Sequence, residues 1–116
     1  MNRSFLVSEE INDVLVFRLG IDFLDASNSG EYKTLSVPLL KNTQKLVFDL
    51  TGVTFIDSSG LGALLSTMRN LSERGGSFRV CNITPAIKVL FELVRINKIL
   101  PIHITLEEAL QAAQQE

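Results

Sequence analysis

The chain has 116 residues, of which 46% are hydrophobic and 21% are charged, a balance that excludes intrinsic disorder and fits one domain with its own core. The net charge of -2 gives no general electrostatic reason to bind nucleic acid or an anionic membrane. The only cysteine, Cys81, cannot form an internal disulfide, and its strand-like surroundings predict a buried free thiol.

Nothing in the sequence indicates a membrane segment. No apolar run is long enough to cross a bilayer, and the polar stretch Met1–Glu10 lacks the apolar run of a signal peptide. We therefore expect a cytoplasmic protein that forms one domain over residues 1–116.

The first elements in the chain are two short apolar runs, Phe5–Ser8 and Val14–Leu19. Asn12 and Asp13 lie between them, and both residue types tolerate left-handed backbone geometry. The pattern predicts an antiparallel hairpin at the start of the sheet.

A loop over Gly20–Asn28 precedes the first predicted helix, for which Ser27 or Asn28 can serve as the N-terminal cap. The helix contains Pro38, which cannot donate a backbone hydrogen bond and collides with the preceding turn. We expect a kink or a break near Val37.

The next strand covers Lys45–Leu50, and its nearly continuous apolar run indicates a strand covered on both faces. After a turn at Thr51-Gly52, the apolar stretch Val53–Ile56 leads into a helix that begins at Asp57-Ser58-Ser59. One face of this helix carries apolar residues at spacings of three and four, and Gly75-Gly76 is suited to end it. Those residues are Leu61, Leu64, Leu65, Met68 and Leu71.

The last third of the chain repeats the alternation of strand and helix. Ser77–Ile83 reads as a strand, and Thr84-Pro85 as the cap and first position of a helix. Pro101–Ile104 reads as a short edge strand, and Thr105–Glu108 as a capping box. The two helices have apolar faces made of Ile87, Leu90, Phe91 and Val94, and of Leu106, Ala109, Leu110 and Ala113.

The resulting order is ββαβαβαβα. Such alternation predicts an α/β domain with a mixed, mostly parallel sheet of about five strands and about four helices, two or so of them covering one face.

The junction Asp57-Ser58-Ser59-Gly60 is the candidate functional site. Taken alone, these residues are most simply a helix cap. However, Gly60 and Gly62 both fall in the first turns, where each costs on the order of 1 kcal/mol relative to alanine. We expect them to leave the helix start bare, so that another backbone can approach it. A helix N-terminus also favours an added anion such as a phosphoryl group.

The stretch Phe55–Gly62, FIDSSGLG, resembles the signature of STAS-domain anti-sigma factor antagonists, which act in bacterial partner-switching systems. The resemblance extends over nearly the whole chain. Further matching segments are Leu24–Asn28, Val47–Leu50, Gly75-Gly76, Val80–Pro85, Leu90–Leu93 and Glu108–Leu110.

This resemblance implies a regulator without enzyme activity and without a cofactor. The unmodified protein would bind an anti-sigma factor that is a serine/threonine-protein kinase and so free the sigma factor. Phosphorylation of Ser58, with Ser59 as the second candidate, would end the binding, and a PP2C-type serine phosphatase would restore it. The partner-binding residues implied are Asp25, Asp57, Ser58, Ser59, Gly60, Leu61 and Gly62. No nucleic-acid or membrane partner is expected, and the state is a monomer or weak dimer.

Two features depart from the family pattern: the segment Gly20–Asp25 has extra residues, and Pro38 is unusual in its helix. Two alternatives stay open. The chain could be a STAS subunit of another assembly, such as a lipid-transport or stress-signalling complex, that docks a partner without being phosphorylated. It could also be a sensor of a nucleotide or another small molecule.

Other readings fit less well. Glu9-Glu10, Asp49 and Lys88 have the residue types of a response-regulator receiver, but only about five residues separate Ser8 from Val14, too few for the helix that a receiver needs there. Asp49 is instead expected to face solvent or to cap the following turn. His103 is expected to be structural, and no nucleophile elbow, phosphate loop or metal-ligand spacing is present.

Overall fold

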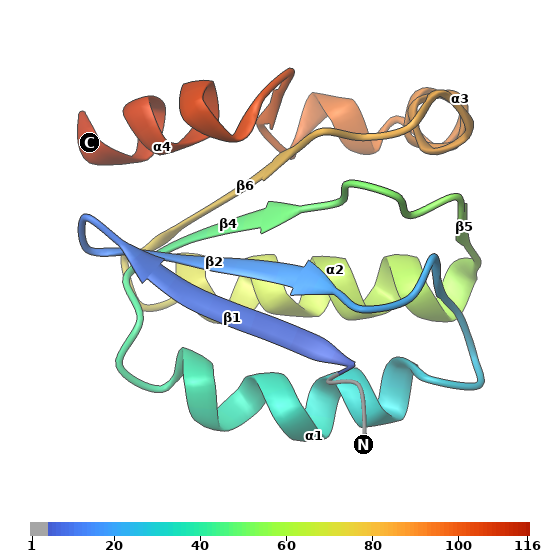
Figure 1. Ribbon diagram of the computed structural model, residues 1–116, viewed down its shortest axis with the longest axis horizontal. Coiled ribbons are helices and arrows are strands. Elements are labelled where there is room, and N and C mark those ends of the chain that lie inside the picture. The colour runs from blue at the N-terminus through green and yellow to red at the C-terminus, as the bar shows by residue number, and fades with distance from the viewer. Residues whose placement is uncertain (1–4) are drawn as a thin grey trace.

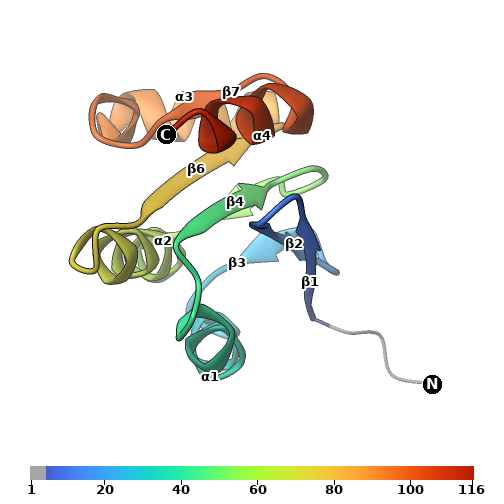
Figure 2. The same cartoon turned by 90° about the vertical axis from the view of Figure 1, so that its left-hand side faces the viewer.

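The computed structural model describes residues 5–116, so the part of the signal-peptide prediction that concerns residues 1–4 lies outside it. The main sheet has five strands in the order β1-β2-β4-β6-β7; the first four are labelled in Figure 1 and β7 in Figure 2. β1 is antiparallel to β2, and every other pair is parallel, which confirms the predicted mixed sheet. The strands are β1 (Leu6–Ile11), β2 (Val14–Leu19), β4 (Lys45–Asp49), β6 (Ser77–Cys81) and β7 (Ile102–His103).

The hairpin between β1 and β2 follows the sequence prediction. Asn12 and Asp13 have φ angles of 50° and 70°, the left-handed geometry that a tight turn of this kind requires. The pairing register runs from Leu6 opposite Leu19 to Ile11 opposite Val14. β1 is longer than predicted, because it continues past Ser8 to the turn itself.

The helices lie on both faces of the sheet. α1 and α2 cover one face, as predicted, whereas α3 and α4 lie on the other side (Figure 2). A short 3-10 helix, η1, follows α3. The bounds are α1 (Ser29–Leu40), α2 (Ser58–Ser72), α3 (Pro85–Leu93), η1 (Ile96–Lys98) and α4 (Leu106–Gln114).

The alternation of side chains along β4 explains the two layers. Leu46 and Phe48 belong to the large core cluster, while Val47 belongs to a smaller cluster with Ala109 and Ala113 of α4. Within the large cluster Tyr32 of α1 lies 5.8 Å from Phe48, centroid to centroid, with the rings stacked. Both strand faces are therefore buried, as the apolar run predicted.

A second, two-stranded ribbon was missed by the sequence analysis. β3 (Phe23–Leu24) and β5 (Phe55–Ile56) pair in parallel, within segments that were predicted as a loop and as an apolar lead into the helix. Two further backbone bonds extend the ribbon: the Thr54 N–H donates to the Asp22 carbonyl at 2.8 Å, and the Asp57 N–H to the Leu24 carbonyl at 3.3 Å. The ribbon brings the loop after β3 beside the start of α2.

Several local predictions need correction. α1 runs through Pro38 to Leu40, so the break expected as one alternative near Val37 does not occur; the kink, the other alternative, stays a prediction. Thr84 precedes α3 as predicted, but its hydroxyl donates to the Val53 carbonyl at 2.7 Å and does not cap the helix. Val94 is 48% exposed, so it is not part of the buried face of α3. On α2 the buried positions include Thr67, whose hydroxyl pairs with that of Tyr32 at 2.7 Å.

Other predictions are confirmed. Cys81 is a buried free thiol, and burial raises its pKa to about 12. The Thr105 hydroxyl accepts a hydrogen bond from the Glu108 N–H at 3.1 Å, which confirms one half of the predicted capping box; the return bond from the Glu108 carboxylate is not formed within residues 5–116. His103 is partly buried, with its Nε2 3.1 Å from a guanidinium nitrogen of Arg79.

Asp49 does cap the turn after β4, but it does not face solvent. Its residue is 5% exposed, and its Oδ1 accepts from the Thr51 N–H at 3.1 Å and from the Thr51 hydroxyl at 2.6 Å. Asn82 donates to the same oxygen, and the Arg18 Nε donates to Oδ2 at 3.1 Å. We call this group the Asp49 corner: Arg18, Asp49, Thr51 and Asn82.

Candidate functional site

Asp57 is the residue that fixes the start of α2. It adopts an extended conformation at the N-cap position, and its Oδ1 accepts a hydrogen bond from the Gly60 N–H at 2.9 Å. Its other oxygen, Oδ2, accepts from the Ala26 N–H at 3.0 Å. One carboxylate therefore holds two segments that are 31 positions apart in the sequence.

These donors also set the protonation of Asp57. The Gly60 N–H makes the largest contribution to lowering the pKa of the Asp57 carboxyl below its ordinary value, and the N–H groups of Ala26 and Ser59 add to it. The helix start therefore carries a negative charge at neutral pH.

Ser58 and Ser59 are the first two residues of α2, and both are exposed. Within residues 5–116, neither hydroxyl has a hydrogen-bond partner. Asp57 supplies the cap in their place. Because the capping role belongs to Asp57, local structure gives no reason for a hydroxyl at either serine.

The two early glycines have different surroundings. A Cβ on Gly60 would lie 2.2 Å from the Leu24 carbonyl oxygen and 2.8 Å from Ile56 Cγ2. Gly60 is buried, so the prediction that it leaves the helix start bare is wrong: the backbone that approaches it is that of β3. Gly62 is exposed, with nothing within 4 Å of a Cβ placed there. Of the two glycines, Gly62 is the one at which the backbone of the helix start is exposed.

The loop after β3 places Asp25 at the same end of the molecule. Its carboxylate accepts from the Ser27 N–H at 2.9 Å and from the Ser27 hydroxyl at 2.5 Å. Asn28 sits at the N-cap position of α1, but its side chain accepts from the Asp25 N–H and makes no cap bond to the helix. Together with the bond from Ala26 to Asp57, these contacts join the starts of α1 and α2.

The site residues implied by the sequence therefore lie together, with different exposures. Ser58, Ser59 and Gly62 are exposed, Asp25 and Asp57 are partly exposed, and Leu61 is partly buried against the core. The contribution of Ala26 was missed, because a backbone N–H has no residue-type signal. The pairing of β3 with β5 brings Ala26 beside Asp57. The only sign of this pairing in the sequence was the short apolar pair Phe23-Leu24.

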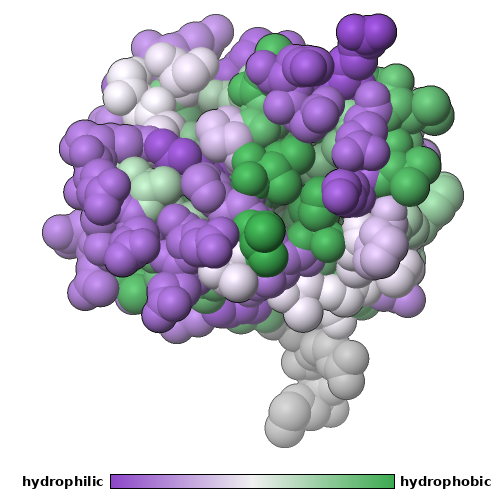
Figure 3. Space-filling model, turned by 90° about the horizontal axis from the view of Figure 1, so that it is seen from above, coloured by the Kyte–Doolittle hydropathy of each residue, from purple (hydrophilic) through white to green (hydrophobic). Residues whose placement is uncertain are grey.

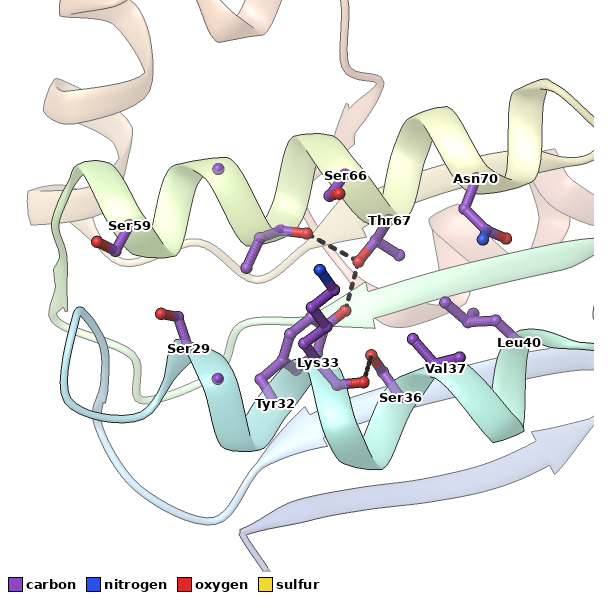
Figure 4. A pocket seen from close by; sticks show the side chains of 13 residues that line it. Ser29, Tyr32, Lys33, Ser36, Val37, Leu40, Ser59, Ser66, Thr67 and Asn70 are labelled. Carbon is purple, nitrogen blue, oxygen red and sulfur yellow. Dashed lines mark hydrogen bonds between the residues drawn. The ribbon is translucent and has the colours of Figure 1, made fainter.

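A groove of about 340 Å³ runs between α1 and α2 (Figure 4). Ser59 lines it at one end, across from Ser29 on α1, and Ser58 does not line it. The bonded hydroxyls of Tyr32 and Thr67 lie deeper in the groove. The two candidate serines thus differ, because Ser59 lines the groove against α1 and Ser58 lies outside it.

No group of three or more His, Cys, Asp or Glu residues within residues 5–116 could hold a metal ion. No helix in the same range is long and apolar enough to cross a membrane.

The fold and the polar strand-to-helix junction are those of a known domain family. A model of the STAS domain matches residues 6–109, so the chain belongs to the STAS domain family. The match includes the ribbon, the start of α2 and the whole five-stranded sheet.

Among characterised relatives, the anti-sigma-B factor antagonist of Bacillus subtilis is 27% identical over 111 residues, 96% of this chain and 100% of the relative. The anti-sigma F factor antagonist of Paenibacillus polymyxa is 32% identical over 63 residues, a match that spans about half of each protein (54%).

Solved structures show the same fold. A putative anti-sigma factor antagonist of Thermotoga maritima superposes with a TM-score of 0.85 at 23% identity, covering 94% of both chains. The antagonist SpoIIAA in its unphosphorylated form gives a TM-score of 0.78 at 22% identity, over 96% of this chain and 97% of that one. The phosphorylated form from Bacillus gives 0.68 at 23% identity, over 92% and 97%.

Proposed function

We propose that the protein is an anti-sigma factor antagonist. Its unmodified form binds an anti-sigma factor that is a serine/threonine kinase, and binding frees the sigma factor. Phosphorylation of Ser58 switches the binding off. The observation that carries this proposal is the Ser58 hydroxyl itself, which is exposed at the first position of α2 and has no partner among residues 5–116.

The covalent step uses groups that the kinase supplies. The Ser58 Oγ attacks the γ-phosphorus of ATP, an Oγ–P bond forms, the bond to ADP breaks, and the hydroxyl proton passes to a base of the kinase. A PP2C-type phosphatase reverses the modification by hydrolysis, which returns the hydroxyl and releases inorganic phosphate. Neither step needs a catalytic group from this chain.

The phosphoryl group changes the charge at the site. It brings about −1.5 to −2 charges beside Asp57, whose carboxylate is already ionised at neutral pH. The helix N-terminus tolerates an added anion, so the fold can carry the modification. A partner that presents carboxylates to this end is repelled, and the bulk of the phosphate separates two surfaces that were in contact.

Ser58 is preferred over Ser59 on geometry as well as on resemblance. Ser59 lines the groove against α1, whereas Ser58 lies outside it. A kinase that must surround the acceptor hydroxyl can approach Ser58 without displacing α1. Asp25, Asp57, Leu61 and Gly62 border the same end of the molecule and form the proposed contact area around the serine; Gly60 contributes by holding β3 and not by direct contact.

The experiment uses the serine-kinase anti-sigma factor encoded nearest to this protein's gene. Its affinity is measured by calorimetry for the wild type, for Ser58→Ala and for Ser58→Asp. We expect wild type and Ser58→Ala to bind with similar affinity and Ser58→Asp to lose at least tenfold. Equal affinity of all three variants would contradict the switch, and no binding by any would contradict the antagonist role.

The groove between α1 and α2 favours one alternative, a small-molecule sensor, because its volume of about 340 Å³ lies at the lower end of known ligand pockets. Calorimetry of the protein with ATP, GTP and common metabolites decides this. A heat of binding that is lost in Ser66→Phe, which fills the groove wall, would support the sensor. The absence of any heat would retire it.

A further inference from the structure

The end of the molecule that carries Ser58 also carries an apolar surface that the proposed switch does not explain. Phe55 of β5 is 54% exposed, and Val89 and Leu93 on α3 are 62% and 78% exposed. β5 ends one residue before the N-cap of α2, and α3 packs against β5. Figure 1 shows α3, β5 and the start of α2 at the same end of the molecule.

Val89 and Leu93 are four residues apart and so lie on one face of α3, although α1 also carries exposed apolar residues, Val37 among them at 53%. In Figure 3 the hydrophobic residues gather on the half of the view that contains α3, while the half with the C-terminal part of α4 is mostly hydrophilic. Two further apolar residues near α3 are well exposed, Val94 at 48% and Ile99 at 59%. Contiguous exposed apolar surface is uncommon on monomeric proteins and marks interaction sites.

This apolar surface lies in a basic surrounding. Residues 85–98 contain three cations, Lys88, Arg95 and Lys98, and one anion, so the segment has a net charge of +2 while the rest of the chain has −4. All three cations are exposed, and within residues 5–116 none of them forms an ion pair. They are therefore available to carboxylates of a partner.

Arg95 adopts a backbone conformation that is unfavourable for residues other than glycine. Its φ is +61°, the left-handed region where glycine is the usual residue at the end of a helix. Arginine here keeps a cation at the edge of the apolar surface in a conformation that glycine would adopt more easily.

We infer that Phe55, Val89 and Leu93, bordered by Lys88 and Arg95, form a docking surface for the kinase partner, separate from the phosphoacceptor Ser58. The partner segment that fits is an apolar one flanked by carboxylates. This inference rests on the proposed function and adds a contact area to it. Across this end of the molecule, α3 attracts the acidic border of the partner, while Asp25 and Asp57 repel it. The division of charge fixes the orientation in which the serine is presented.

The same charges connect docking to the switch. A partner with an acidic border is held by Lys88 and Arg95 and is repelled when Ser58 becomes phosphorylated. Arginine is among the residues enriched in energetically dominant contacts, which makes Arg95 a candidate for one. Phe55, three positions before Ser58, lies where docking and phosphorylation meet.

The test compares Val89→Asp with Val37→Asp, a matched control. Val37 is 53% exposed on α1 and lies eight residues beyond the first residue of that helix, about 12 Å along its axis. Phosphorylation of each variant by the neighbouring kinase is measured as initial rate against protein concentration. We expect Val89→Asp to raise KM at least tenfold with kcat unchanged, and Val37→Asp to leave both constants as in the wild type.

A second variant separates docking from folding. Arg95→Gly removes a cation and suits the left-handed backbone, so its melting temperature is expected to equal or exceed that of the wild type. Its KM is expected to rise about threefold or more at low ionic strength and to approach the wild-type value in 0.5 M NaCl, where charges are screened.

Several outcomes overturn the inference. An unchanged KM for Val89→Asp, with normal phosphorylation of Ser58, would refute the docking surface and leave the switch intact. A wild-type dimer in sedimentation that Val89→Asp dissociates would assign the surface to a second copy of this chain. Binding of the wild type, but not of Val89→Asp, to phosphatidylglycerol vesicles would assign it to a membrane. Failure of the wild type to be phosphorylated at all would refute the proposed function itself.

Discussion

The Asp49 corner and the junction at Ser58 contain similar polar residues. They differ in whether those side chains find hydrogen-bond partners within the protein. Asp49 is the last residue of β4 and Asp57 directly follows β5, and hydrogen bonds lower the pKa of each. At the corner every polar side chain is bonded within the protein, and Asp49 is 5% exposed. At the junction Asp57 is bonded on both oxygens, but the two hydroxyls beside it have no partner within the described part of the chain, residues 5–116. A polar cluster with all its partners present holds the fold together; one with exposed, unpartnered hydroxyls is available to another molecule.

The largest expected effect on the free energy of unfolding comes from a substitution at Gly60, because the backbone next to the two serines is tightly packed against β3. Gly60→Ala places a Cβ 2.2 Å from the Leu24 carbonyl oxygen, so the ribbon or α2 must move. Overpacking of this kind costs about 1–3 kcal/mol or more, and we expect a loss of about 3 kcal/mol in the free energy of unfolding.

Gly62→Ala is the matched control, since nothing lies within 4 Å of a Cβ there. Replacing an unencumbered helical glycine by alanine is expected to stabilise the protein by about 0.5–1 kcal/mol. Urea unfolding of both variants measures the difference. Similar effects of the two substitutions would contradict the distinction between a packed and a bare glycine.

The next effect concerns the corner. Asp49→Asn leaves Arg18 without its buried carboxylate partner, and we expect a loss of about 2 kcal/mol at pH 7, as for hydrogen bonds to charged groups. Glu9→Gln is the control, because its ion pair with Arg18 is more exposed and is expected to contribute less than about 1 kcal/mol. A larger loss for Glu9→Gln than for Asp49→Asn would contradict the account of the corner.

The corner also predicts a dependence of stability on pH. Burial opposes the charge of Asp49, but hydrogen bonds from Thr51, Asn82 and Arg18 outweigh it and lower its pKa below the ordinary 3.8. A carboxyl with a lowered pKa in the folded state contributes stability that is complete above its unfolded pKa and is lost as pH falls through the folded one. Between pH 5 and pH 2 the wild type should lose more stability than Asp49→Asn. Parallel curves would show that Asp49 does not titrate differently on folding.

A smaller effect is expected at Asp57. Asp57→Ala removes the cap of α2 and frees the loop that Ala26 belongs to, so we expect a loss of stability smaller than that at the corner. Asp57→Asn keeps an oxygen for the Gly60 N–H and is expected to lose less than half as much. Hydrogen exchange of the Gly60 and Ala26 amides reports the two bonds separately. Unchanged protection of the Ala26 amide in Asp57→Ala would show that Asp57 does not hold the loop.

The sequence predicted most of this architecture because its signals are local. Asn12 and Asp13 marked the hairpin turn, the apolar run of β4 indicated burial on both faces, and Gly75 ended α2. The alternation of elements predicted a mixed, mostly parallel sheet with about two helices on one face, but the spatial order of the strands came from the structure.

What the sequence did not reveal depends on contacts between distant segments. The ribbon of β3 and β5 is two residues long on each side, too short for a periodic signal. Gly60 was interpreted as bare because its neighbour, the Leu24 carbonyl, is 36 positions away. Asp49 was expected to face solvent or to cap a turn. The sequence indicated only the turn, since Arg18 reaches Asp49 from β2 and Asn82 reaches it from the position after β6. The family resemblance is what pointed to Ser58. The structure adds that Asp57 caps the helix, so the exposed Ser58 hydroxyl is not needed for that role.

The most direct test of the account is the mapping of phosphate after the protein is incubated with the neighbouring serine kinase and ATP. Tryptic peptides of wild type, Ser58→Ala and Ser59→Ala are sequenced by mass spectrometry. The account predicts one phosphate on Ser58 in the wild type and in Ser59→Ala, and none in Ser58→Ala. Phosphate on Ser59, or an unmodified wild type that also forms no complex with the kinase, would contradict it.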